Sequence, residues 1–153
     1  MEKITITKAT ESDLQEILDL QYLAFQFAKK LFKAENIPPL NQKLSELEEE
    51  YKSGIVLKAV ADEKIVGSIR AKIIDGTTYV AKLIVNPKNQ GCGIGTNLLL
   101  EIEKYCVTDR YELFTSTRTA KTVRLYERVG YKKFQEKAFN DELTFVYLEK
   151  IKE

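Results

Sequence analysis

Three glycines stand at alternate positions between a strand-like segment and a helix-like segment. They are Gly91, Gly93 and Gly95, and they follow an apolar run that ends at Val85. Glycine tolerates positive φ angles, so successive backbone N–H groups can turn to one side, and the missing side chain lets an anion approach closely. A helix N-terminus adds unsatisfied amides and the positive end of its dipole. This spacing therefore predicts a site for a phosphate-bearing ligand.

Three kinds of nucleotide-binding loop can be compared with this segment. A Walker A loop needs a lysine and then a serine or threonine after its last glycine, whereas Thr96 and Asn97 follow Gly95 here. A dinucleotide fingerprint needs GxGxxG spacing and an acidic residue at the end of the next strand, whereas Glu112 opens that strand. The pattern Gln-x-x-Gly-x-Gly fits without adjustment, beginning at Gln90. A bare strand-to-helix turn rarely needs three glycines, so a ligand-binding loop is favoured.

A second motif lies in the next predicted helix, where Leu125 and Tyr126 are followed by Gly130 and Tyr131. Together with the glycine loop, and with the Val-x-Pro that precedes the loop, this motif resembles the two signatures of the GNAT family of acetyltransferases. The order of the expected elements also resembles that of the family, so the resemblance covers nearly the whole chain. It implies the GNAT fold of the α/β (α+β) class, a single mixed, mostly antiparallel sheet flanked by helices.

The resemblance implies that acetyl-CoA and a primary amine bind together and that the amine attacks the thioester directly. Tyr126 is then expected to act as the general acid toward the departing CoA thiolate. The backbone of Leu83, Ile84 and Val85 would contact the pantetheine arm and the acetyl carbonyl, with one N–H as a one-donor oxyanion hole. The pyrophosphate is assigned to the loop residues Gln90, Gly91, Cys92, Gly93, Ile94, Gly95 and Thr96.

Two positions depart from the second signature of the family. Thr119 and Thr122 stand where asparagine and alanine are common. Thr119 can still cap the helix and reach CoA through its hydroxyl, so both threonines are retained as cofactor-binding candidates. For Tyr126 the alternative is a structural tyrosine packed on the core, and its place in the signature favours the catalytic role.

The general base is not identified by the sequence. Relatives often carry glutamate or histidine early on the strand before the loop, and the matching position here is Tyr79. A neutral tyrosine is a poor base near pH 7. A water chain that ends on a carboxylate is more plausible, with Glu112, Asp141 or Glu142 as its end. Many solvated amines also lose enough of their protons unaided.

Substrate selection is expected in residues 22–54, where relatives differ most. Four glutamates cluster within residues 46–50 of this stretch, and they form either an acidic rim that attracts a cationic amine or a solvated helix face. The solvated face is the favoured interpretation. The phenylalanines of this stretch are interpreted as core or dimer contacts, so the acceptor stays open as a small-molecule or peptide amine. The four glutamates are Glu46, Glu48, Glu49 and Glu50.

The composition excludes several kinds of chemistry. The 153 residues contain no histidine, which rules out Ser-His-Asp and Cys-His nucleophile systems and the usual histidine zinc sites, so no metal is expected. A formal net charge of +1 gives no electrostatic argument for nucleic acid or an anionic membrane. Neither a signal peptide nor a membrane anchor is found, which points to the cytoplasm. The two cysteines, Cys92 and Cys106, suggest no disulfide framework.

One α/β domain over residues 1–153 is expected to position these groups, in the order β-α-α-β-β-β-α-β-α-β-β. Hydrophobic periodicity separates the strands from the helices, and short turns at 62–63 and 75–76 indicate an antiparallel meander. The predicted strands cover residues 4–7, 55–61, 64–74, 77–85, 111–115, 131–138 and 143–150. The predicted helices cover residues 14–30, 40–51, 94–109 and 119–129.

Two functions are compatible with these features. The first is an active acetyl-CoA-dependent N-acetyltransferase. The alternative is a catalytically weak acyl-CoA-binding sensor or regulatory module of the same fold. A nucleotide-binding protein unrelated to CoA is disfavoured, and the long terminal strands are compatible with a homodimer.

Overall fold

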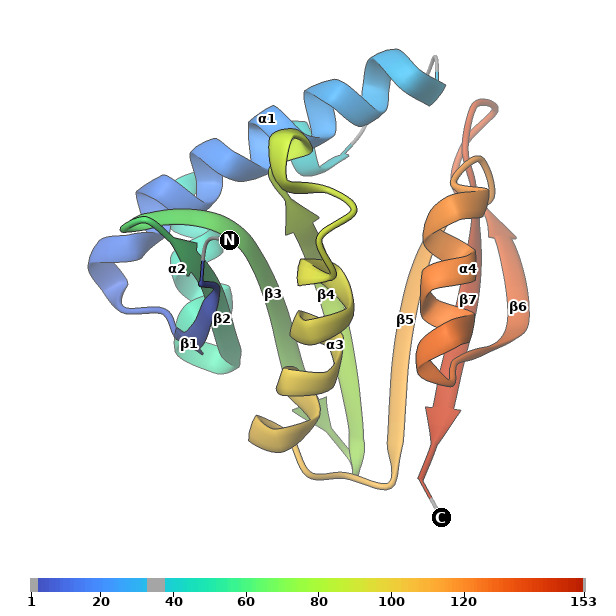
Figure 1. Cartoon of the computed structure of the whole chain (residues 1–153). Coiled ribbons are helices and arrows are strands. Elements are labelled where there is room, and N and C mark those ends of the chain that lie inside the picture. The colour runs from blue at the N-terminus through green and yellow to red at the C-terminus, as the bar shows by residue number, and fades with distance from the viewer. Residues whose placement is uncertain (1–2, 33–37, 153) are drawn as a thin grey trace.

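A computed structural model describes residues 3–32 and 38–152. Within them, seven strands form one sheet in the order β1-β2-β3-β4-β5-β7-β6, and four α-helices flank it (Figure 1). The predicted element order and the mixed, mostly antiparallel sheet are confirmed. The strands are β1 (Thr5–Lys8), β2 (Ile55–Ala61), β3 (Lys64–Ile74), β4 (Thr77–Val85), β5 (Arg110–Ser116), β6 (Lys132–Ala138) and β7 (Thr144–Ile151). The helices are α1 (Leu14–Phe32), α2 (Leu44–Ser53), α3 (Ile94–Tyr105) and α4 (Ala120–Val129).

The strands β2, β3 and β4 form an antiparallel meander closed by two tight turns. Asp62 and Glu63 have φ angles of 50° and 64°, and Asp75 and Gly76 have φ angles of 48° and 80°. Positive φ at both central residues is type I′ geometry, whose twist matches that of the flanking strands. The turns therefore fix the strand ends, and all three strands occupy the residues predicted for them.

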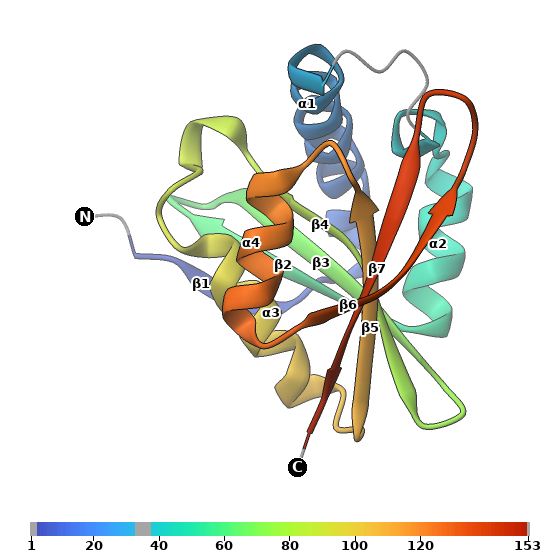
Figure 2. The ribbon, with the colours of Figure 1, turned by 90° about the vertical axis from the view of Figure 1, so that its right-hand side faces the viewer.

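The helices cover the two faces of the sheet in separate pairs (Figure 2). α3 and α4 lie on one face, and α1 and α2 lie on the other. Leu98 and Ile102 of α3 belong to the core on the first face. Ile17 of α1 and Leu47 of α2 pack with Ile84 of β4 in the core on the second face. Burial of these apolar helix faces on both sides stabilises the sheet and fixes the position of β4 in its middle.

The start of α2 differs from the prediction. The helix begins at Leu44 rather than Leu40, and Pro38–Asn41 forms a separate 3₁₀ turn before it. The carboxylate of Glu46 accepts a hydrogen bond of 2.8 Å from the backbone N–H of Lys43. This contact satisfies an amide that the first helical turn leaves without a partner, so the helix starts after Lys43.

The other helix ends are closer to the prediction. The capping box before α1 is confirmed, because the backbone N–H of Thr10 donates to the carboxylate of Asp13 at 2.8 Å. α3 is shorter than predicted and ends at Tyr105, since Cys106 is already extended. Gly130 closes α4 with a φ of 112°, as predicted for a glycine at this position.

Candidate active site

β4 and β5 are parallel neighbours that separate soon after they pair. Thr77 pairs with Arg110, and the last pair is Tyr79 with Glu112. Beyond this point β4 stays paired with β3 as far as Val85. Its other edge has no strand partner among the described residues, and Figure 1 shows β5 diverging from β4. Backbone N–H and C=O groups on that edge are therefore open to a ligand that lies extended along the strand.

The glycine loop joins the end of this open strand to α3. Gly91 and Gly93 have φ angles of 84° and 81°, and a Cβ at either position would meet no heavy atom within 4 Å. Glycine is therefore needed at these two positions for the backbone conformation, because L residues avoid positive φ angles. Gly95 differs, because a Cβ there would lie 3.3 Å from the side chain of Leu125. The first two glycines shape the loop, and the third lets α3 approach α4.

A cavity of about 360 Å³ opens between the glycine loop, the end of β4 and α4. The loop motif and the Leu-Tyr motif, which are far apart in the sequence, both contribute to its wall. Ten of the predicted site residues line it, namely Leu83, Val85, Gln90, Gly91, Gly93, Ile94, Gly95, Thr96, Thr122 and Tyr126. The cavity is continuous with the open edge of β4 through Leu83 and Val85, so one elongated ligand can use both.

Three predicted cofactor-binding residues do not line this cavity. The side chain of Ile84 is 3% exposed and packs in the core on the other face, so only its backbone can serve the open edge. Cys92 is exposed on the loop. Thr119 occupies the N-cap position of α4, but its hydroxyl donates to the backbone C=O of Ser116 at 2.6 Å. The expected side-chain cap is wrong, because this hydroxyl accepts no hydrogen bond from a backbone N–H of the first turn of α4.

Tyr126 projects from α4 into the wall of the cavity. Its side chain is only 6% exposed, and its ring lies 6.1 Å from that of Tyr131. Burial raises the pKa of Tyr126 well above its ordinary value. Its hydroxyl makes no hydrogen bond to another described residue. A neutral phenol with a free O–H at the cavity wall can donate a proton or a hydrogen bond to a ligand atom.

Four cavity residues were not predicted from the sequence. Asn89 precedes the glycine loop, and the other three lie on α4, namely Lys121, Leu125 and Arg128. Spacings of four and three residues place these three on one face of the helix. That spacing could have been recognised, because Leu125 already belonged to the second sequence motif. The two cations complement a ligand that carries several negative charges.

None of the suggested proton acceptors lies among the residues that line the cavity. Tyr79 is at the paired end of β4 and is 39% exposed. Glu112 forms an ion pair of 2.9 Å with Arg110. Asp141 and Glu142 are exposed beside the turn between β6 and β7. The described residues therefore supply no side-chain base at the cavity wall.

Within residues 3–32 and 38–152, neither a metal site nor a membrane-spanning helix is present. No group of three or more His, Cys, Asp or Glu side chains there could hold a metal ion. In the same residues, no helix has the length and apolarity needed to cross a membrane.

A sheet that splays beside a glycine loop, with a tyrosine of α4 at the cavity wall, is typical of acetyltransferases of the GNAT type. The sequence agrees with this class. Residues 25–152 match the family described as "Acetyltransferase (GNAT) domain", and the chain belongs to this family.

Individual relatives show the same relationship. Over 118 residues the chain is 26% identical to the "Uncharacterized N-acetyltransferase YjcF" of Bacillus subtilis (strain 168), covering 77% of this chain and 82% of that protein. The PaiA N-acetyltransferase of Thermoplasma acidophilum, solved in complex with coenzyme A, superposes with a TM-score of 0.82 at 20% identity, covering 97% of this chain and 99% of that one. The ribosomal-protein-S18-alanine N-acetyltransferase of Escherichia coli gives a TM-score of 0.81 at 13% identity, covering 99% and 96%. At these identities the structural likeness establishes the fold.

Proposed function

We propose that residues 1–153 form one N-acetyltransferase domain, which moves an acetyl group from acetyl-CoA to a primary amine by direct attack in a ternary complex. The observation that carries this proposal is the continuity between the positive-φ glycine loop, the cavity and the unpaired edge of β4. A pyrophosphate joined to a slender, amide-containing arm has the shape and the hydrogen-bonding groups that such a site accepts.

The residues present fit acetyl-CoA. Backbone amides from Gln90 to Thr96 and the N-terminus of α3 would hold the pyrophosphate. Lys121 and Arg128 line the same cavity and would balance the phosphate charge. The backbone of Leu83 to Val85 on the open edge would pair with the amides of the pantetheine arm. The buried Ile84 side chain is compatible with this role, since only its main chain is required.

The chemistry assigned to this chain is limited to a few groups. A backbone N–H of β4 near Leu83 would stabilise the oxyanion that forms on the acetyl carbonyl. Tyr126 would donate to the departing sulfur, because burial keeps its phenol protonated. No described side chain at the cavity wall acts as base, so the acceptor would lose its proton to water before it attacks. A chain without histidine can perform this reaction, because the two substrates react directly with each other.

Two measurements test the proposal. Acetyl-CoA should raise the melting temperature, since a ligand that binds only the folded state stabilises it by mass action. A panel of primary amines should then release free CoA thiol from acetyl-CoA. The absence of a thermal shift at millimolar acetyl-CoA excludes the proposal. A clear shift with no thiol release from any amine favours the alternative, an acyl-CoA-binding sensor of the same fold.

A further inference from the structure

Lys82 has a backbone conformation that is unusual for a strand residue. Among the described residues, four that are not glycine have positive φ, and three of these lie in the tight turns after β2 and β3. Lys82 is the fourth, with a φ of 53°, and it lies inside β4. The register of β3 and β4 shifts between Ser68 and Arg70, so Lys82 belongs to a β-bulge. Bulges re-aim side chains, and a strained residue beside a site directs attention to function.

The charges that act on the Lys82 ammonium are those of Glu46 and Glu50 of α2 and of Arg70, so the side chain faces the α2 side of the sheet. The next residue, Leu83, lines the cavity on the opposite side. Burial lowers the pKa of the Lys82 ammonium, while Glu50 acts against this effect. Lys82 forms no hydrogen bond or ion pair with another described residue. Glu46 also favours the charged form, but neither glutamate forms an ion pair with Lys82. A partly buried ammonium that lacks a direct ion pair among the described residues can gain from a bound anion.

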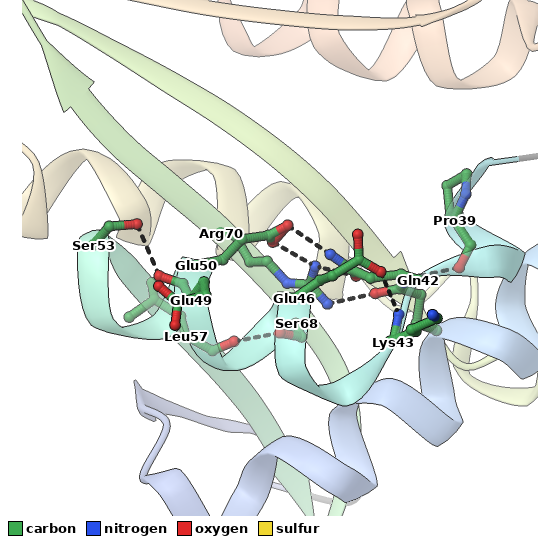
Figure 3. Close-up of polar contacts among 11 residues, drawn as sticks. Pro39, Gln42, Lys43, Glu46, Glu49, Glu50, Ser53, Leu57, Ser68 and Arg70 are labelled. Carbon is green, nitrogen blue, oxygen red and sulfur yellow. Dashed lines mark hydrogen bonds and ion pairs between the residues drawn. The ribbon is translucent and has the colours of Figure 1, made fainter.

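The neighbouring carboxylates are engaged by other groups (Figure 3). The guanidinium of Arg70, 3% exposed, donates to Glu50 and to Gln42 at 2.9 Å each. Gln42 also donates to Glu50 at 2.7 Å, and Glu46 accepts the backbone N–H before α2. The Nε–H of Arg70 has no partner among the described residues. The cluster therefore holds its acidic side chains in internal contacts and retains unsatisfied cationic donors.

Across the open edge of β4 lies a group of aromatic side chains on β5 and β7. The last pair of the parallel strands is Tyr79 with Glu112, so Phe114 lies two residues further on, level with the start of the bulge. Phe114 is 47% exposed, and its ring centroid lies 5.0 Å from that of Phe145 and 5.2 Å from that of Tyr147. Their neighbours along the strands point to the opposite face of the sheet. These neighbours, Leu113, Val146 and Leu148, pack in the core under α3 and α4. The three rings therefore face the same side of the sheet as Lys82.

We propose that the acceptor is an amino acid with a large apolar side chain, whose carboxylate pairs with the ammonium of Lys82 and whose side chain lies against Phe114, Phe145 and Tyr147. This inference rests on the proposed function, because it assigns the acceptor of the same reaction. A cation that has no ion pair within residues 3–32 and 38–152 gains from a bound anion, and an exposed aromatic group gains from being covered by an apolar body. The two features flank the open edge of β4, where the acetyl carbonyl is proposed to lie.

The reaction balances without a further reagent. The amine nitrogen forms a bond to the acetyl carbon as the carbon–sulfur bond breaks. The ammonium form of the acceptor loses two protons in all, one to water before attack and one that ends on the CoA sulfur. The products are an N-acetyl amino acid and CoA thiol. Lys82 keeps its proton throughout and acts only by holding the carboxylate.

Four acceptor amines test the contributions of the carboxylate and of the apolar side chain separately. L-Phenylalanine has the amine, the carboxylate and the apolar body; phenethylamine lacks the carboxylate, glycine lacks the apolar body, and putrescine lacks both. CoA thiol release is measured for each, and rates are corrected for the fraction of neutral amine. We expect kcat/KM for L-phenylalanine to exceed that for phenethylamine by about 10- to 100-fold, the effect of one charge-assisted hydrogen bond. Equal or faster transfer to phenethylamine or putrescine overturns the proposal.

Variants of Lys82 test the carboxylate contact directly. Lys82→Met removes the charge and keeps most of the side-chain length, whereas Lys82→Arg keeps the charge. The ratio of kcat/KM for L-phenylalanine to that for phenethylamine should fall about 10- to 100-fold in Lys82→Met and largely persist in Lys82→Arg. Lys72→Met is the matched control, because Lys72 is an exposed lysine of β3 away from the bulge. An unchanged ratio in Lys82→Met overturns the proposal.

Failure of the proposed acetyl transfer can be distinguished from failure of the Lys82 contact. Acetyl transfer is excluded if acetyl-CoA produces no thermal shift or if no amine releases thiol. The Lys82 contact can still be measured by binding, as the thermal shifts produced by N-acetyl-L-phenylalanine and by N-acetylphenethylamine in the presence of CoA. A larger shift with the carboxylate ligand, lost in Lys82→Met, supports the contact. Equal shifts with the two ligands overturn it.

Discussion

At the scale of single residues, the phenol of Tyr126 is the group whose removal should separate binding from catalysis. Tyr126→Phe leaves the ring that packs beside Tyr131 and deletes only the O–H at the cavity wall. We expect kcat to fall about 100-fold or more, the usual contribution of a positioned general acid. The affinity for acetyl-CoA, measured by calorimetry, should stay within twofold. Tyr105→Phe is the control, because this tyrosine is 38% exposed at the end of α3.

The same variant decides between the two candidate functions. Activity that is indifferent to Tyr126→Phe across a broad amine panel contradicts the catalytic role of this hydroxyl. Retained binding of acetyl-CoA in that case supports the sensor alternative.

Two buried tyrosines form a matched pair for measuring the effect of a hydroxyl on stability. The hydroxyl of Tyr131 is buried without a hydrogen-bond partner among the described residues, whereas that of Tyr111 donates to the C=O of Cys106 at 2.6 Å. Tyr131→Phe should therefore leave the free energy of unfolding unchanged or raise it by about 1 kcal/mol, since it removes an unsatisfied polar group. Tyr111→Phe should lower it by about 1–3 kcal/mol, because an accepting carbonyl is left unpaired. Urea denaturation of both variants checks the difference, and equal losses in the two contradict it.

At the scale of elements, the glycine loop and a hairpin turn allow strain to be separated from ligand binding. Gly93 and Gly76 have nearly equal φ angles, 81° and 80°, and a Cβ at either would meet no heavy atom within 4 Å. Replacing either by alanine should cost about 1–2 kcal/mol of stability, the strain of an L residue in this region. Only Gly93→Ala should also weaken acetyl-CoA binding, by about tenfold or more, because it disturbs amides that would hold the pyrophosphate. Comparable binding losses in Gly76→Ala would contradict a local role for the loop.

The sequence predicted some elements closely because their ends are set by local chemistry. The residues of β2, β3 and β4 followed from two short polar turns between apolar runs. The start of α2 was misplaced, because nothing local distinguishes the 3₁₀ turn of Pro38–Asn41 from a first helical turn. The hydroxyl of Thr119 was misassigned for a similar reason. The residue does stand at the N-cap position, but its side chain is turned to the C=O of Ser116 in the preceding turn and accepts no helix N–H.

The bulge in β4 shows the limit of sequence reasoning at the candidate site. Lys82 lies in a largely apolar segment that the sequence predicts as a regular strand. Positive φ is usually signalled by glycine or asparagine, and neither occurs at this position. The bulge arises from how β3 and β4 align over their whole length, which is a tertiary property. The position of the cavity was predictable from the glycines, whereas the cation on the other side of the strand was not.

At the scale of the whole molecule, the absence of histidine predicts the pH dependence of activity. No side chain here has an ordinary pKa between 5 and 8, and the acceptor must lose a proton before it attacks. We therefore expect kcat/KM to rise tenfold per pH unit and to level off above the pKa of the acceptor amine. Burial raises the pKa of Tyr126, so its phenol stays protonated and produces no decline up to about pH 10.

The prediction is checked by measuring kcat/KM as a function of pH for two acceptor amines with different pKa values. The break in the profile should move with the pKa of the amine. A break that stays at one pH for both acceptors identifies a base within the protein and contradicts proton loss to water.

The divergence of β4 and β5 also affects which kinds of chain can lie along the open edge of β4. An unpaired strand at the border of a sheet can recruit a strand from any other chain. Here the unpaired edge lies in the interior of the sheet, with β5 still present on its far side. A polypeptide strand carries side chains on both faces and needs room above and below, whereas an unbranched arm with sparse amides needs almost none. We therefore expect a slender, unbranched arm to lie along this edge more readily than a polypeptide strand, whose side chains would meet the helices that cover the sheet.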